Sequence, residues 1–425
     1  MRARARTFGA RLALIALGAL VIRVVIVLTI SRHVLGAGDF QYFQDVSGFI
    51  AHGQGFMDPF EREFHNLTLP TANHPPLWPL VLAVATKLGA ASIVWHKLVG
   101  ALIGAGVVVL VGLLGRAIGG DRLGLAAGGV AALYPLLVAA DSSMMSETLY
   151  GFWIAATLLF ALKLRRTPTL GWAAALGASI SLAALTRSEG LALLVLLAIP
   201  LCIAAGKRRL LLSATCVLAA LVVLAPWTAR NFIKFHRPVL ISTNDGTLLA
   251  GANCDATYHG IDLGGWRLDC ISPRTKLNEA AQASIWSREG IDYAFDHASR
   301  WPVVVPVRIL RAFDFYQPRR QVLFAEARQR HLEQVGIAVY YVLLVLAIPG
   351  AVLMWRRARD VFLILMAPVV LVILTAAFGY GITKMRHAAE IPIVLLSSVT
   401  MLELLDRARA GRPLRLRSAG PVHAE

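Results

Sequence analysis

The chain has 425 residues, of which 57% are hydrophobic, and its mean hydropathy of +0.64 exceeds what a water-soluble protein can bury. Its formal net charge of +17 does not indicate nucleic-acid binding, because the Lys and Arg residues form short clusters between long apolar runs. The composition therefore predicts an integral membrane protein.

The first apolar run, residues 12–30, follows four arginines in residues 1–11 and is long enough to cross a bilayer at about 1.5 Å per residue. We interpret it as an uncleaved anchor and not a signal peptide, because Arg23 interrupts it and no small-x-small cleavage site follows. We expect Arg23 either to snorkel to the outer interface or to meet a lipid phosphate.

Short basic segments predict the cytoplasmic side of the protein. They are residues 1–11, 116–122, 163–166, 207–209, 356–359 and 407–417. About ten spanning helices then alternate between the two sides, and both termini lie in the cytoplasm. The predicted spans are residues 12–30, 94–114, 123–140, 148–162, 170–185, 191–205, 210–225, 336–355, 361–378 and 391–405.

One further apolar run, residues 77–90, would invert every later loop if it crossed the membrane, so we predict a short helix against the outer leaflet. The predicted fold is thus an all-α membrane catalytic domain over residues 1–406, with a basic, disordered cytoplasmic tail at 407–425. Two larger external loops, residues 31–95 and 227–334, carry short helices. In the second loop, Cys254 and Cys270 could pair in an oxidising compartment.

Asp39 follows the first span and should lie near the membrane surface, where lipid head groups lie. A carboxylate at this level is placed to act as a general base toward an acceptor hydroxyl. The alternative is a carboxylate that only caps the following helix. Tyr42 in the same segment is assigned to substrate binding, as is His74, for which helix capping is an equal alternative.

The external turn 141–147 brings two more carboxylates to the same side. Asp141 is chosen as a second acidic residue of the catalytic site, a role that the family resemblance given below implies. Glu147 is assigned to substrate binding, although it could simply begin the next helix, where the helix dipole stabilises a glutamate. Either carboxylate could hold a divalent cation, but no spacing in the sequence is specific for a metal.

Four cationic residues are also external on this topology, and a leaving lipid phosphate needs positive charge. They are Arg187, Arg230, Lys384 and Arg386. The alternative is that they pair with neighbouring carboxylates such as Glu189 and Glu390.

Several short motifs together resemble the membrane-embedded C-type glycosyltransferases that use polyprenyl-phosphate sugars, including protein O-mannosyltransferases and the aminoarabinose transferases of lipid A. The matching segments are Asp39 after the first span, Gly-Gln-Gly-Phe at 53–56, Pro-Pro-Leu-Trp-Pro at 75–79, Ser146-Glu147, Pro-Trp-Thr-Ala-Arg-Asn at 226–231 and Ile-Ser-Thr-Asn-Asp-Gly at 241–246. The late turn Lys384-Met385-Arg386 departs from the family's pattern because it lacks an aromatic residue.

The resemblance implies transfer of a glycosyl group from a polyprenyl-phosphate donor to an acceptor hydroxyl at the extracytoplasmic face, with inversion. The acceptor, whether glycan, lipid or protein, is not identified by the sequence. No cofactor is required by the motifs, and a divalent cation is left open. The alternatives are a transporter or lipid flippase, which would place charges near the bilayer midplane and show inverted repeats, and a non-catalytic envelope assembly protein.

Overall fold

The computed structural model describes residues 2–274, 277–324 and 326–410. These residues form helices joined by loops, and the β-structure within the described ranges is limited to a single bridge between Met57 and Pro70. The all-α prediction is confirmed.

Among the described residues, seven helices are long and apolar enough to cross a membrane, so the chain is a multi-pass membrane protein. They are α1 (Arg2–Ile26), α5 (Ile93–Gly119), α8 (Glu147–Arg166), α11 (Arg209–Phe235), α17 (Arg330–Arg357), α18 (Arg359–Phe378) and α19 (His387–Ala410).

An eighth span is broken into α6 (Asp121–Leu133) and α7 (Pro135–Asp141), which meet at an angle of 61°. The break falls at Tyr134, which is extended because the ring of Pro135 disfavours a helical conformation in the residue before it. Two shorter apolar segments complete the set, α9 (Leu170–Ala184) and the stretch Ser188–Ile203, which ends in α10 (Ile199–Ile203).

Every predicted span thus coincides with a helical segment, but the count of about ten stays a prediction because the last two segments are short for a bilayer. Residues 77–90 form the short helix α4 (Leu77–Lys87), as expected. Residues 407–410 of the expected disordered tail are helical and belong to α19. Residues 411–425 lie outside the described part of the chain.

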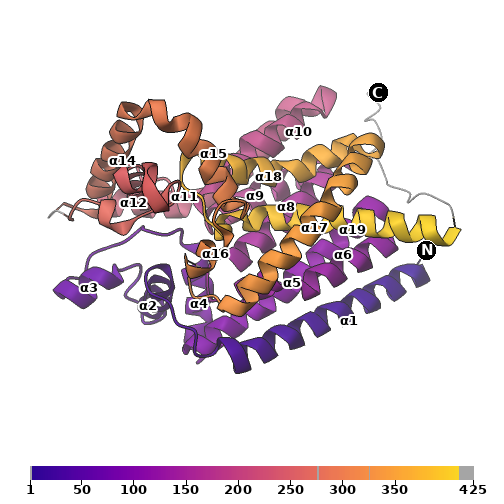
Figure 1. Ribbon diagram of the computed structural model, residues 1–425, viewed down its shortest axis with the longest axis horizontal. Helices are drawn as coiled ribbons and strands as arrows, with labels where there is room; N and C mark the ends of the chain where they lie inside the picture. The colour runs from indigo at the N-terminus through magenta and orange to yellow at the C-terminus, as the bar shows by residue number, and fades with distance from the viewer. Residues whose placement is uncertain (1, 275–276, 325, 411–425) are drawn as a thin grey trace.

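The remaining helices gather at one end of the molecule, on the left of Figure 1, whereas α1 begins and α19 ends at the opposite end. Those from the first predicted loop are α2 (Asp39–Ala51) and α3 (Pro59–His65). Those from the large loop are α12 (Asn244–Ala252), α13 (Asp255–Tyr258), α14 (Glu279–Asp296), α15 (Trp301–Ala312) and α16 (Pro318–Gln321). The start of α1 and the end of α19 lie at the same end of the molecule, which agrees with the predicted parity; which compartment that end faces stays a prediction.

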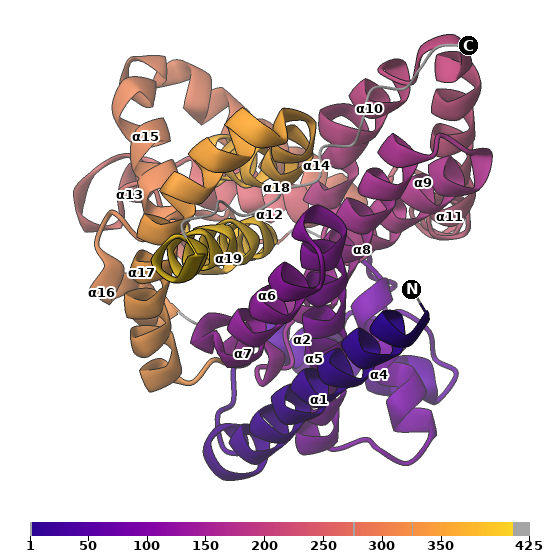
Figure 2. The same cartoon turned by 90° about the vertical axis from the view of Figure 1, so that its right-hand side faces the viewer.

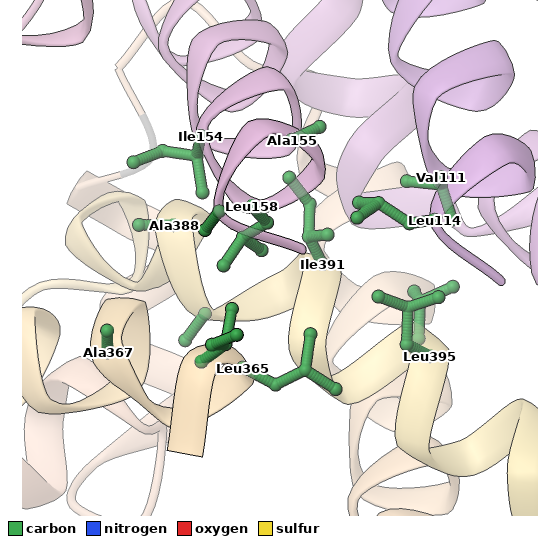
Figure 3. Close-up of a cluster of buried hydrophobic side chains, with 14 of the residues drawn as sticks. Val111, Leu114, Ile154, Ala155, Leu158, Leu365, Ala367, Ala388, Ile391 and Leu395 are labelled. Atoms are coloured by element: carbon green, nitrogen blue, oxygen red, sulfur yellow. The ribbon is translucent and has the colours of Figure 1, made fainter. Parts of the chain in front are cut away.

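Apolar side chains from the long helices form one core, in which α19 lies against α6, α17 and α18 (Figure 2). Figure 3 shows part of it, where Ile391 and Leu395 of α19 face Leu158 of α8 and Leu114 of α5. Glycines let helices approach closely, since a Cβ at Gly177 would collide with the backbone carbonyl of Cys216. This rigid bundle is the platform on which the loop helices rest.

Arg23 follows neither of the two interpretations given for it. The side chain is fully buried, and its Nε lies 2.5 Å from Oδ2 of Asp141. It also donates to the carbonyls of Ala131 and Ala132 at the broken end of α6. A buried guanidinium needs a counter-charge and acceptors, and the last residue of α7 supplies the counter-charge while the break supplies the acceptors.

Cys254 and Cys270 form a disulfide, as predicted, while Cys202 and Cys216 are free and buried. The bond lies within the large loop and joins two residues that are 16 positions apart in the sequence.

We expect the double substitution Cys254→Ser, Cys270→Ser to lower the free energy of unfolding by about 3 kcal/mol, because the bond restricts the unfolded chain. Thermal unfolding in detergent micelles measures the loss, with Cys202→Ala, Cys216→Ala as the control that removes two thiols but no crosslink. Quantitative alkylation of Cys254 and Cys270 in protein purified without reductant would contradict the bond itself.

Candidate functional site

Asp39 is the first residue of α2, where the positive end of the helix dipole favours a charged carboxylate. Its Oδ1 lies 3.3 Å from Nε2 of His74, and its Oδ2 lies 3.1 Å from Nζ of Lys384. The three groups come from α2, from the segment before α4 and from the turn before α19. Residues distant in sequence therefore form one charged cluster.

Glu326 is a fourth member of this cluster, which we call the Asp39 cluster. Its Oε2 lies 3.2 Å from Nζ of Lys384, and its Oε1 accepts a hydrogen bond from the backbone N–H of Phe40 at 3.3 Å. One ammonium group therefore bridges two carboxylates. Sequence reasoning missed Glu326, since no motif marks it within the large loop.

The pKa values of the two carboxyl groups, Asp39 and Glu326, are shifted in opposite directions. Burial alone would raise the pKa of Asp39, but the charges of Lys384 and His74 outweigh it and hold that pKa well below its usual 3.8. Burial and the neighbouring charge of Asp39 raise the pKa of Glu326 above its usual 4.5. Asp39 is therefore ionised at neutral pH.

Two cavities meet at the Asp39 cluster. The larger, cavity A, has a volume of about 620 Å³, and the smaller, cavity B, about 250 Å³. Both cavities are lined by Asp39, Asn244, Leu248, Tyr380 and Lys384. A ligand in either cavity can thus reach the same carboxylate and the same ammonium group.

Cavity A combines cations with apolar walls. Arg187 lines it and is held by Glu189, whose Oε1 lies 2.7 Å from Nε, and by Glu147, whose Oε1 lies 3.3 Å from Nη1. Arg237 also lines it, and no ion pair joins Arg237 to another residue in the described ranges. Its apolar wall includes Leu191, Val239, Leu240 and Ile241.

Glu147 itself lies behind Arg187, fully buried, and lines neither cavity. Its Oε1 is also 3.9 Å from Nη2 of Arg328, which pairs with Glu333 at 2.8 Å. Its position fits a residue that orients Arg187.

Cavity B adds an acidic, an aromatic and a basic side chain of the large loop to the shared residues. Asp262, Trp266 and Arg311 line it together with the shared residues. The carboxylate of Asp262 is paired twice, with Arg267 at 2.8 Å and Arg320 at 2.6 Å. Arg311 instead donates to the carbonyl of Gly381 at 3.1 Å, so its positive charge faces the cavity without a carboxylate partner in the described residues.

The remaining predicted site residues lie outside both cavities. Tyr42 is buried behind His74, with the ring centroids 4.6 Å apart. Arg230 donates to the carbonyls of Thr71 and Phe56, and thereby ties the first loop to α11.

Asp141 and Arg386 are held inside the helical bundle. Asp141 binds Arg23 and accepts a hydrogen bond from Thr148 at 2.8 Å. Arg386 is fully buried, with Asp314 at 2.8 Å and Glu390 at 2.7 Å. Neither residue lines cavity A or cavity B.

Tyr380 is a further residue that sequence reasoning missed, although it lies only four positions before Lys384. It lines both cavities. Met385 stands where the resembling family has an aromatic residue. Tyr380 is the aromatic residue that lines the cavities close to this turn.

Comparison with known proteins supports one fold. Residues 73–229 match the family model described as dolichyl-phosphate-mannose-protein mannosyltransferase. No curated protein matches the chain in sequence.

Among solved structures, the archaeal oligosaccharyltransferase of Archaeoglobus fulgidus, in complex with an inhibitory peptide and a dolichol-phosphate, is 13% identical with a TM-score of 0.56. The match covers 96% of this chain but only 52% of that one. The same enzyme in complex with Zn and sulfate gives a TM-score of 0.53 at 13% identity, covering 94% and 50% of the two chains.

ArnT from Cupriavidus metallidurans, bound to undecaprenyl phosphate, is 18% identical over 92% of this chain and 78% of that one, with a TM-score of 0.43. The chain spans about half the length of the archaeal oligosaccharyltransferase whose fold it shares. The resemblance to membrane-embedded C-type glycosyltransferases is confirmed: residues 73–229 carry the mannosyltransferase family pattern, and the chain has the fold of the archaeal oligosaccharyltransferase.

Proposed function

We propose that the chain is a membrane glycosyltransferase that moves a sugar from a polyprenyl-phosphate donor to an acceptor hydroxyl at the extracytoplasmic face, with inversion. The observation that carries this proposal is the position of Asp39, an ionised carboxylate between two cavities and in contact with Lys384 and His74. Direct displacement needs a base on one side of the reacting carbon and a stabilised phosphate on the other.

Cavity A suits the donor. Arg187 and Arg237 offer positive charge to a phosphate, and the apolar wall at Leu191 and Leu240 suits the first part of a lipid chain. The mannosyltransferase family model, whose description names a dolichyl-phosphate sugar, supports a donor of this class.

Cavity B then suits the acceptor. Trp266 and Tyr380 supply aromatic surface, and Arg311 and Asp262 supply polar groups. Such a combination fits a hydroxyl-bearing ligand, since amphipathic rings and a few placed polar groups fix the orientation of a sugar or a side chain. The acceptor stays open among glycan, lipid and protein.

In the proposed reaction the acceptor oxygen attacks the anomeric carbon and its proton passes to Asp39. The bond between that carbon and the phosphate oxygen breaks, and its electron pair leaves with the polyprenyl phosphate. Lys384 and Arg187 offset the negative charge that develops on the phosphate. Attack opposite the leaving group inverts the anomeric carbon.

A divalent cation does not fit the Asp39 cluster. Both oxygens of Asp39 already contact positively charged or protonatable nitrogens, and no group of three or more metal-binding side chains occurs in the described parts of the chain. The proposed reaction therefore assigns charge stabilisation to Lys384 and Arg187.

Asp39→Asn should lower turnover of a polyprenyl-phosphate sugar by roughly 10²- to 10⁴-fold, because the amide cannot accept the proton. The matched control is Asp45→Asn, which changes a carboxylate on the same helix outside both cavities and should leave turnover unchanged. The purified proteins are assayed by mass analysis of products with a panel of such donors. A transporter would instead bind these donors and release them intact.

Lys384→Met should move the acid limb of the pH profile of kcat/KM to higher pH. Lys384 is one of the charges that lower the pKa of Asp39, so its removal raises that pKa and protonates the base at a higher pH. Lys384→Arg keeps the charge and should keep the limb near its original position. An unmoved limb in Lys384→Met would show that Asp39 is not the titrating base.

Arg187→Gln and Arg230→Gln should have different effects. Loss of a charged hydrogen bond at Arg187 should raise donor KM by roughly 10- to 100-fold, which corresponds to about 1.5–3 kcal/mol. Arg230→Gln leaves the carbonyl of Thr71 without a donor and removes one of the two donors to the carbonyl of Phe56, so it should cost about 1–3 kcal/mol of stability with donor KM unchanged. Steady-state kinetics and thermal unfolding separate the two; equal effects on KM would contradict the assignment of cavity A.

A further inference from the structure

Helix α15 (Trp301–Ala312) of the large loop has its polarity reversed relative to a helix in water. The side chains of Arg308 and Arg311, one turn apart, are each only 3% exposed. Val303 and Leu310, seven positions apart on another face, are 42% and 41% exposed, and Pro306 between them is exposed as well. A surface helix in water places its charges outward and its apolar face inward.

The neighbouring helix of the same loop turns its charged side chains outward, although Ile291 and Phe295 near its end are exposed as well. In α14 (Glu279–Asp296), Ala283 and Trp286 are buried, whereas Arg288, Glu289 and Asp292 are exposed. The reversal is therefore a property of α15 and not of the whole loop. The change occurs at the junction of the two helices, where the ring of Trp301 contacts that of Phe295 with centroids 5.4 Å apart.

Helix α15 packs against α18 (Arg359–Phe378), one of the apolar helices long enough to span the membrane, and the two lie side by side in Figures 1 and 2. Arg308 donates to the carbonyl of Ala377 at 3.2 Å, which fixes α15 beside the end of α18. Phe378 at this end is 75% exposed. The apolar face of α15 thus continues the apolar surface of a spanning helix.

From this arrangement we infer that α15 is immersed in the outer interface of the bilayer, with its Val303–Leu310 face against lipid acyl chains and Trp301 at the level of the head groups. Trp is favoured at this level because one part of its ring is apolar and its N–H is polar. Apolar side chains that water would disfavour are solvated by lipid, and the arginines that lipid would disfavour are turned into the protein.

The immersion of α15 has a consequence for the proposed site. Arg311 extends from the buried face of α15 into cavity B and donates to the carbonyl of Gly381. One helix therefore contacts lipid on one face and lines a cavity on the other. The contact between α15 and lipid holds cavity B next to the membrane surface. It also keeps the large loop from moving away from the bundle.

The inference can be tested without any assay of activity. Nitroxide labels are attached to Val303→Cys and to Leu310→Cys, in protein that carries Cys202→Ala and Cys216→Ala and retains the disulfide. Matched labels on Arg288→Cys and Asp292→Cys of α14 report the aqueous side of the same loop. Each protein is placed in nanodiscs of phosphatidylethanolamine and phosphatidylglycerol, and collisions with molecular oxygen and with a neutral nickel chelate are measured.

Labels at 303 and 310 should collide readily with oxygen and poorly with nickel, giving positive depth parameters, and labels at 288 and 292 should give negative ones. Nickel accessibility at 303 and 310 equal to that at 288 and 292 would place α15 in water and overturn the inference. Protection of 303 and 310 from both reagents would also overturn it, since a protein partner such as a second copy would then cover this face.

A second measurement guards against misfolding of the labelled proteins. Brominated acyl chains should quench the fluorescence of the unlabelled protein more than that of Trp301→Phe. The protein has 9 tryptophans, and the substitution removes one that lies at the interface, within reach of the bromine atoms. Equal fractional quenching of the two proteins would contradict the immersion of Trp301. Neither result depends on whether the chain transfers a sugar.

Discussion

A charge buried inside the helical bundle is held by a counter-charge or by hydrogen-bond acceptors, and this constraint decides which charged residues are free for chemistry. Arg23 pairs with Asp141, and Arg386 pairs with Asp314 and Glu390, all with little or no exposure. Breaking such a pair leaves an uncompensated charge in a low-dielectric interior, which typically costs about 3–5 kcal/mol. These pairs therefore hold the spans together, and their members are not available to a substrate.

The charges of the Asp39 cluster are paired as well, but Asp39 is more exposed than the paired charges inside the bundle. Lys384 pairs with both Asp39 and Glu326, yet the side chain of Asp39 remains 34% exposed. A ligand can therefore approach a carboxylate that is held ionised by its neighbours. The proposed chemistry depends on this combination of pairing and access.

Much of the fold could be predicted from the sequence, because apolar runs long enough to span a bilayer have few alternatives to helix. The short helix at 77–90 and the pairing of Cys254 with Cys270 also follow from local sequence and shared placement. The bend between α6 and α7 was not predicted, although Pro135 is its physical cause.

The sequence alone determined that the chain is a helical membrane protein, since long apolar runs are a local property. It predicted Asp39, His74, Arg187 and Lys384 near one site only as members of a larger set of polar residues at span ends. Only the tertiary structure decided which of the other charges reach a cavity. Asp141, Arg230 and Arg386 resemble Asp39 and Arg187 in sequence, but their partners Arg23, Thr71 and Asp314 are supplied by distant segments. Glu326 joins the cluster for the same reason: pairing across 58 residues to Lys384 depends on how helices pack, which no local pattern contains.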